Sequence, residues 1–444
     1  MALQAGAQRE TSFPSPKPPS SPIPMSSTTS QSPPPECTFR AQLTVFGAFL
    51  ALFCTFGQFN AFGTFQTWYA AHQLHHLSPS TIAWIGSLQL WVFFFSGGFI
   101  GRVFDAFGPF WLLTTGSVIL VASIILTSVA TQYYQLILAQ GILFGLGVGL
   151  LFYPSLISVS THFNKYRATA LGLAAAGSSA GGVVYPIMLQ QLFKSVGFGW
   201  AVRISALLSA LCCITAILTI SCGPSYNPCK SSDPSKVIGM WASARIAFSD
   251  IRFTLLAIGS CIAALGLFIP YFYILDFVNA TSPELALSPT TAFYLIAALN
   301  AGGIPGRIAP AYLADVIGRF NLLVPAAFFS GVAVLSMWLV QKVPALIIAF
   351  AVLYGFSSGA FVALINPCVA QISEKGCVGS RIGLLYTVIA FPSLIGNPAA
   401  GALLSRQHGS FTGLVAFSGS TVIVGSLVIL AARFAVDKRI CTRV

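Results

Sequence analysis

The stretch from Ala41 to Gly101 contains no Lys, Arg, Asp or Glu. It is too long for a single membrane span, because about 20 residues of helix cross the hydrocarbon core of a bilayer. The polar segment His72–Pro79 divides it into two predicted helices, with Ser78 or Ser80 as the N-cap of the second. A soluble domain has about 25% charged residues, whereas this chain has 7%. We therefore expect a helical membrane protein.

The other apolar runs predict ten further helices, so that six lie on each side of a polar segment at 223–250. Their expected ranges are 110–130, 134–154, 168–190, 202–222, 251–275, 289–309, 320–341, 344–366, 382–404 and 411–433. The predicted fold class is an all-α membrane protein with 12 transmembrane helices in two pseudo-symmetric six-helix bundles, residues 39–222 and 251–433. Residues 1–38, rich in Pro, Ser and Thr, are expected to form a disordered cytosolic tail, 223–250 a cytosolic linker, and 434–444 a second cytosolic tail.

A short motif occurs once in each predicted half, in the hinge between the second and third helices. The matching residues, both spaced D-x-x-G-x-F, are Asp105, Gly108 and Phe110 in the first half and Asp315, Gly318 and Phe320 in the second. Arg167 and Arg381 likewise open the fifth predicted helix of each half. Such repeats indicate two halves copied from one six-helix unit.

The basic residues agree with this order of helices. Twelve spans put both termini on one side, and all but four of the 22 Lys and Arg residues fall there. The four exceptions are Lys194, Arg203, Lys342 and Arg406. Basic loops mark the cytoplasmic face, so we expect a multi-pass protein of the cell membrane with both termini cytoplasmic. The sequon at Asn279 then falls in an outer loop, where it is a candidate glycosylation site.

The hinges supply the candidate gating residues. Asp105 lies close to Arg102, and Asp315 lies close to Arg319. A carboxylate in such a hinge can accept hydrogen bonds from a helix N-terminus or pair with an arginine. Either contact would influence which side of a membrane protein built from two such halves opens. The alternative is an aspartate that only forms a turn on a solvated loop. Because the hinge is repeated, we favour a gating role.

Three polar residues are the candidate substrate-binding set. Arg307 ends a long uncharged run, at or just inside the cytoplasmic end of the predicted eighth helix. A charge there is costly unless it faces water or a partner, so it is a functional candidate. The alternative is a snorkelling side chain at the helix end. Asn60 and Asn300 lie within apolar spans and must hydrogen-bond across helices or line a wet cavity.

The chain resembles the major facilitator superfamily, and more narrowly its monocarboxylate-transporter-like branch of fungal type. The resemblance covers Arg40 to Arg433 and implies two bundles that rock about a central solute site. The stretches that carry it are the two hinges, Gly47–Phe49, Phe62–Gln66, Trp84–Gln89, Gln140–Gly145 and Arg167–Pro186.

The resemblance also has informative departures. In animal carriers of this branch, a helix-one lysine works with an Asp/Arg pair in helix eight to bind a carboxylate and a proton. The corresponding positions here are Asn60, Gly303 and Arg307. The resemblance therefore implies that an anionic group can still be held at Arg307, and it leaves proton coupling open.

These observations predict a secondary transporter that moves a small organic solute by alternating access across a fungal membrane. The solute is monocarboxylate-like or secondary-metabolite-like, and the lost Lys and Asp positions favour a larger, amphipathic solute and efflux. No Walker motif is present, so ATP does not drive transport directly. The alternative is a non-transporting nutrient sensor of the same fold. An enzyme is not expected, since the chain has no H-E-x-x-H motif and no acidic pair within its spans.

The expected partners are the small organic solute and the lipid bilayer, with a proton as the candidate coupling ion. The net charge of +12 does not indicate nucleic acid, because the basic residues form no cluster with interleaved aromatic residues. We expect a monomer without a cofactor. A metal site is not expected either, because His72, His75 and His76 have no carboxylate nearby in the sequence.

Overall fold

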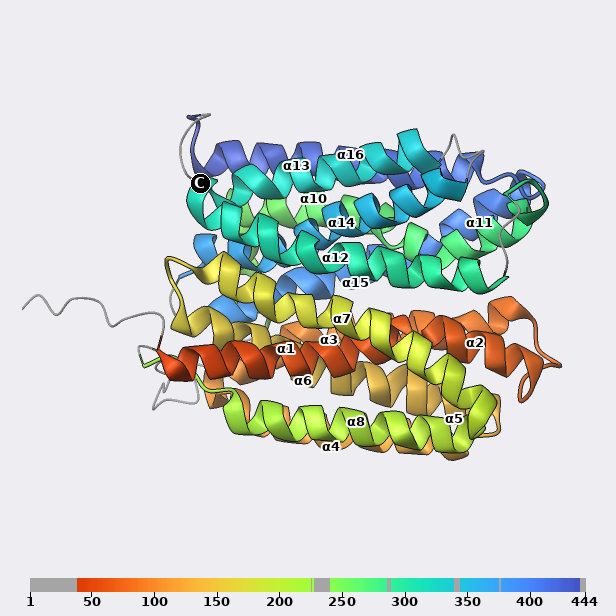
Figure 1. The fold of residues 1–444 in the computed structure, drawn as a ribbon. Coiled ribbons are helices and arrows are strands. Elements are labelled where there is room, and N and C mark those ends of the chain that lie inside the picture. The colour runs from red at the N-terminus through yellow and green to blue at the C-terminus, as the bar shows by residue number, and fades with distance from the viewer. Residues whose placement is uncertain are drawn as a thin grey trace, which may run out of the picture. The chain divides into compact units, whose positions relative to one another are not determined.

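The computed structural model describes residues 38–224, 226, 240–285, 289–338, 344–374 and 377–439 (Figure 1). These residues belong to one compact unit, Glu36–Val444. The predicted N-terminal tail, up to residue 37, and the last five residues of the predicted C-terminal tail lie outside the described residues.

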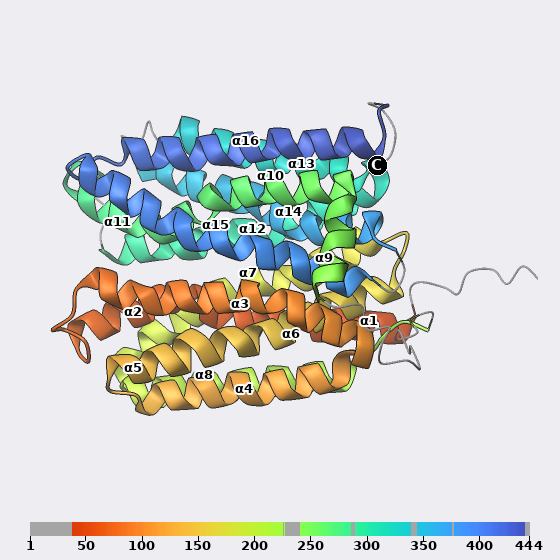
Figure 2. The ribbon, with the colours of Figure 1, turned by 180° about the vertical axis from the view of Figure 1, so that it is seen from behind.

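The described part of the chain consists of helices. Those of the first half are α1 (Phe39–Asn60), α2 (Phe62–Ala71), α3 (Pro79–Phe107), α4 (Pro109–Val129), α5 (Tyr133–Leu136), a π-helical stretch (Ile137–Leu143), α6 (Phe144–His162), α7 (Arg167–Ser195) and α8 (Phe198–Thr219). Those of the second half are α9 (Met240–Ser249), α10 (Ile251–Leu267), α11 (Ile269–Leu285), α12 (Pro289–Ile317), α13 (Arg319–Ala333), a π-helical stretch (Val334–Trp338), α14 (Pro344–Ile372), α15 (Val378–Arg406) and α16 (Thr412–Val436). The short helix α9 lies within the predicted linker and runs crosswise to the spans (Figure 2).

Eleven helical segments in the described residues are long and apolar enough to cross a membrane. The predicted eighth span, α12, is not among them, although its 29 residues make it as long as α3 or α7. It is not apolar enough, because it contains the polar residues Asn300 and Arg307. Both of these residues are buried. A polar span is stable only where protein or water covers it, and α12 packs against α7 and α14.

The two hinges are shorter than the sequence predicted. Helix α3 ends at Phe107 and α4 begins at Pro109, so that only Gly108 separates them, and only Gly318 separates α12 from α13. Both glycines have a positive φ, 77° and 120°, which a residue with a Cβ rarely adopts. The Asp105 and Asp315 side chains therefore project from the last turns of helices and not from loops.

The halves meet along two helix pairs, α7 with α12 and α3 with α15. Each pair joins the fifth span of one half to the second span of the other, as the duplication requires. Glycines allow close approach at these seams. A Cβ on Gly383 of α15 would overlap the carbonyl oxygen of Gly97 in α3, and one on Gly172 of α7 would overlap that of Arg307 in α12.

Candidate solute site and gate

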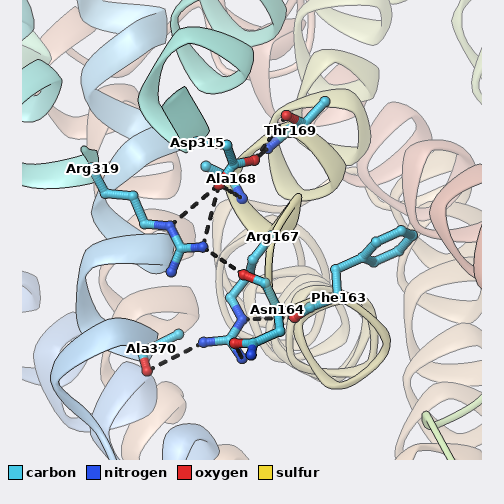
Figure 3. Close-up of polar contacts among 8 residues, drawn as sticks. All are labelled: Phe163, Asn164, Arg167, Ala168, Thr169, Asp315, Arg319 and Ala370. Carbon is cyan, nitrogen blue, oxygen red and sulfur yellow. Dashed lines mark hydrogen bonds and ion pairs between the residues drawn. The ribbon is translucent and has the colours of Figure 1, made fainter. Parts of the chain in front are cut away.

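The Asp315 carboxylate, near the end of α12, lies against the N-terminus of α7 in the other half (Figure 3). Its Oδ1 accepts a hydrogen bond from the Ala168 N–H at 3.1 Å. Its Oδ2 accepts from the Thr169 N–H at 2.7 Å and from the Thr169 hydroxyl at 2.8 Å. The first N–H groups of a helix have no partner within the helix and carry the positive end of its dipole, so a carboxylate is the matching acceptor. We call this set of contacts the Asp315 cap.

Two arginines surround the Asp315 cap (Figure 3). Arg319 pairs with Asp315 Oδ1 at 3.3 Å and donates to the carbonyl oxygen of Asn164 at 2.9 Å, so it contacts both halves. Arg167 donates to the carbonyl oxygens of Phe163 at 2.9 Å and of Ala370, across the seam, at 3.4 Å. The repeat marked Arg167 in the sequence, but nothing there indicated its partners.

The second hinge repeats the arrangement with the halves exchanged. Asp105 of α3 accepts hydrogen bonds from the Ser380 N–H at 2.8 Å and the Ser380 hydroxyl at 2.7 Å, in the first turn of α15. We call these contacts the Asp105 cap. Arg102 lies one turn earlier on α3 and is half-buried. Both aspartates are buried, 9% and 5% exposed, so the interpretation as solvated turn residues is wrong. Together the two caps join the halves at the hinge end.

A cavity of about 290 Å³ lies at the opposite end of the same seam. Residues from α1, α2, α7, α11 and α12 line it: Asn60, Gly63, Thr64, Thr67, Trp68, Ala71, His72, Pro186, Gln190, Phe193, Lys194, Leu275 and Ile296. Of the predicted substrate-binding residues, Asn60 is in this lining. Figure 1 shows α2 and α11 at the same end of the spans.

Asn300 lies next to the cavity. Its Nδ2 donates to the carbonyl oxygen of Ile296, a lining residue, at 3.0 Å. Asn60 and Asn300 converge on Gly182 of α7, where an added Cβ would lie 2.8 Å from Asn60 Nδ2 and 2.6 Å from Asn300 Cγ. Gly182 thus leaves the space in which the two amides meet.

Arg307 lies two turns beyond Asn300 on α12 and does not line the cavity. Its side chain is 8% exposed and donates from Nη1 to the Ser179 hydroxyl of α7, so it does not snorkel to the surface. Its Nε is buried without a partner in the described residues. Arg307 therefore occupies the closed part of the seam, between the cavity and the Asp315 cap. Gly177, Ser179 and Gly181 have the spacing of a G-x-S-x-G motif. Ser179 lies inside helix α7, however, and not on the sharp strand-to-helix turn that exposes a catalytic serine.

The structure bears on the candidate glycosylation site at Asn279 and on the histidines for which no metal site was expected. The backbone of Asn279 lies within α11, so the prediction of a loop there is wrong, and its side chain lies outside the described residues. Among the described residues, no group of three His, Cys, Asp or Glu could hold a metal ion. His72 instead stacks on Trp68, with ring centroids 3.8 Å apart.

Comparison with known proteins identifies similar chains. Residues 48–343 match the family model of the Major Facilitator Superfamily. "MFS-type transporter 1" of Ophiocordyceps sp. is 37% identical over 400 residues, which are 90% of this chain and 86% of that protein. "Agnestins efflux protein AgnL12" of Paecilomyces divaricatus is 34% identical, over 93% of this chain and 92% of that protein. The crystal structure of the human organic anion transporter MFSD10 (TETRAN) superposes with a TM-score of 0.68 at 15% identity, covering 91% of this chain and 100% of that one, and shows the shared fold alone.

Proposed function

Because the chain belongs to the Major Facilitator Superfamily, we propose that it is a secondary transporter that exports a small organic solute across a fungal plasma membrane by alternating access. The observation that carries the proposal is the arrangement of the interface between the two halves. The interface is closed at the hinge end by two buried carboxylate caps, one at each helix pair, and it contains a cavity at the other end. Alternating access requires such a state and a second one in which the closed and open ends are exchanged.

The caps provide a physical means of changing which end of the interface is closed. Each cap joins a carboxylate of one half to a helix N-terminus of the other, so the hinge end can open only when both sets of hydrogen bonds break. Arg319 contributes to the first cap through its contacts with both halves. We assign the gating role to Asp105, Asp315 and Arg319 on this basis, and we include Arg102 because it lies one turn before Asp105 on α3.

The distribution of basic residues supports a cytoplasmic hinge end. In that orientation the structure is closed toward the cytosol, and both termini are cytoplasmic. An exported solute would enter when the caps are broken and leave through the cavity. A relative named for agnestins efflux supports this direction and a secondary metabolite as cargo.

Asn60, Asn300 and Arg307 are the proposed solute contacts, from the cavity inward. If a proton is coupled to transport, it requires a buried carboxylate, and in the described part of the chain Asp105 and Asp315 are the buried ones. Both halves of the seam come from one chain, which supports a functional monomer.

The test begins with an untargeted comparison of metabolites inside cells and in the medium, with and without the gene. A solute that accumulates inside the cells lacking the gene is then loaded into proteoliposomes that contain the purified protein. We expect efflux down its gradient at a rate above that of empty liposomes. Binding without flux would instead support the nutrient sensor, and chemical conversion of the solute would support an enzyme.

A further inference from the structure

The described lining of the cavity contains one lysine among apolar and neutral residues. The lysine is Lys194, and the described lining residues include no Asp or Glu. Lys194 is exposed and lies in the last turn of α7, where it is one of the few basic residues on the predicted outer side. An unneutralised cation beside apolar walls attracts anions and disfavours cations.

An aromatic stack forms another part of the lining. The Trp68 indole stacks on the His72 imidazole, with ring centroids 3.8 Å apart at 11°, and is nearly parallel to the Phe198 ring, 5.9 Å away at 13°. Phe193 packs obliquely on the same indole at 5.1 Å. His72 Nδ1 lies 3.1 Å from the Trp68 carbonyl oxygen, which fixes the plane of the imidazole. The exposed member of the stack, His72, therefore offers a fixed flat surface, on which a planar ring can add with little loss of entropy.

We propose that this outer part of the cavity is a binding subsite for planar organic anions, with the Trp68–His72 stack holding the ring and Lys194 holding the anionic group. The amides of Asn60 and Gln190 supply hydrogen bonds between the two. The volume of about 290 Å³ is close to the lower limit, about 300 Å³, of pockets for drug-sized ligands, so a fused two-ring anion is the matching size. The subsite is separate from Arg307, which lies deeper in the seam and outside the lining.

The inference rests on the proposed function, since in an exporter this subsite is the last one that the solute leaves. It adds a substrate class, aromatic anions, and two side-chain groups that sequence reasoning did not select. Trp68 and Lys194 are more than a hundred residues apart in the sequence, and only the packing of α2 on α7 brings them to one cavity.

The test is binding of 1-naphthoate and of its neutral counterpart 1-naphthamide to the full chain in nanodiscs, by titration calorimetry with empty nanodiscs as the blank. We expect Lys194→Gln to weaken 1-naphthoate by about fivefold, the effect of one ion pair at a partly wet site, and to leave 1-naphthamide unchanged. Lys194→Arg should keep the binding. Trp68→Leu should weaken both probes by about fivefold to tenfold, because it removes the support of the stack. Arg406→Gln, which removes another exposed charge on the predicted outer side, is the matched control.

Binding that is the same for both probes, or that responds equally to Lys194→Gln and Arg406→Gln, would overturn the subsite. The variants' thermal melting curves identify any that fail to fold, and Lys194→Met, which removes the charge but keeps an unbranched apolar stem, then still tests the charge. Flux of the cell's own solute is measured in parallel. Flux without Lys194-dependent binding refutes the subsite alone, whereas Lys194-dependent binding without flux refutes the transporter and leaves the subsite intact.

Discussion

Replacing Asp315 by Asn should open the hinge end and close the cavity end. The carboxylate accepts from Ala168 at one oxygen and from Thr169, twice, at the other. An asparagine amide offers only one acceptor oxygen, so at least one N–H of α7 would face an NH₂ group in either orientation. The charge that complements the N-terminus of α7 is lost as well.

The magnitude follows from these contacts. Hydrogen bonds to a charged group contribute about 1.5–3 kcal/mol each, and those between neutral groups about 0.5–1.5 kcal/mol. Losing one of the three bonds and making the other two neutral therefore destabilises the capped state by about 3 kcal/mol or more. A factor of ten in a ratio of states corresponds to about 1.4 kcal/mol. Asp315→Asn should therefore shift the ratio of the two states by about a hundredfold or more. Thr169→Val, which removes only the hydroxyl donor, should shift it by about tenfold, an order of magnitude less than Asp315→Asn.

The assay uses Thr67→Cys, a residue that lines the cavity, as a reporter. Its labelling rate by a membrane-impermeant maleimide, added on the cavity side, reports how long the cavity stays open. The same protein without the reporter is the blank for the native cysteines. We expect Asp315→Asn to slow labelling strongly and Thr169→Val to slow it less. Equal labelling of all three proteins, at equal amount and melting temperature, would refute the gating role of the cap.

Three further outcomes are expected. Asp105→Asn should slow reporter labelling in the same direction, and combining it with the first substitution should slow it further; an effect on melting temperature alone would contradict this. Gly182→Ala should reduce flux severalfold and lower the free energy of unfolding by about 1–3 kcal/mol, because the added methyl overlaps the amides of Asn60 and Asn300. Gly199→Ala is the control, since its methyl meets only one atom at 3.5 Å, and it should change neither quantity. A flux assay and thermal melting measure the two effects. Burial raises the pKa of Asp250, but hydrogen bonds and the charge of Arg252 outweigh burial, so its pKa is lower than the usual 3.8. The stabilisation of the folded protein by Asp250 is therefore present above about pH 4 and is lost as the pH falls through the folded-state pKa. Asp250→Asn should flatten the acid side of the curve of melting temperature against pH. An unchanged curve would contradict the pairing of Asp250 with Arg252.

Several features of the fold could be predicted because lipid offers the backbone no hydrogen-bonding partners. Each span must satisfy its own backbone within one helix, so the length of the apolar runs and the polar breaks between them fixed the order of the helices. The exception is instructive. Helix α12 is not among the segments of the described chain that are apolar enough to span a membrane, since it contains Asn300 and Arg307, and this same polarity marked them as site candidates.

The sequence also selected Asp105 and Asp315, since the duplication repeats the motif, and it selected Asn60 as a polar residue within an apolar span, supported in part by a family resemblance. It did not identify what these residues contact. Each aspartate caps the fifth span of the opposite half, at Thr169 and Ser380, and such a pairing depends on how the halves dock.

The sequence by itself therefore determined which segments enter the bilayer, that they form two copied halves, and which polar residues within them require a partner. The tertiary structure alone decided that the hinge end is closed while the other end holds a cavity, and that Lys194 and Trp68 share it. The physical reason is the distance along the chain over which each property is decided. Burial of apolar runs in lipid is decided within about 20 neighbouring residues, whereas caps and cavities are formed by side chains from helices far apart in the chain, whose contacts depend on packing.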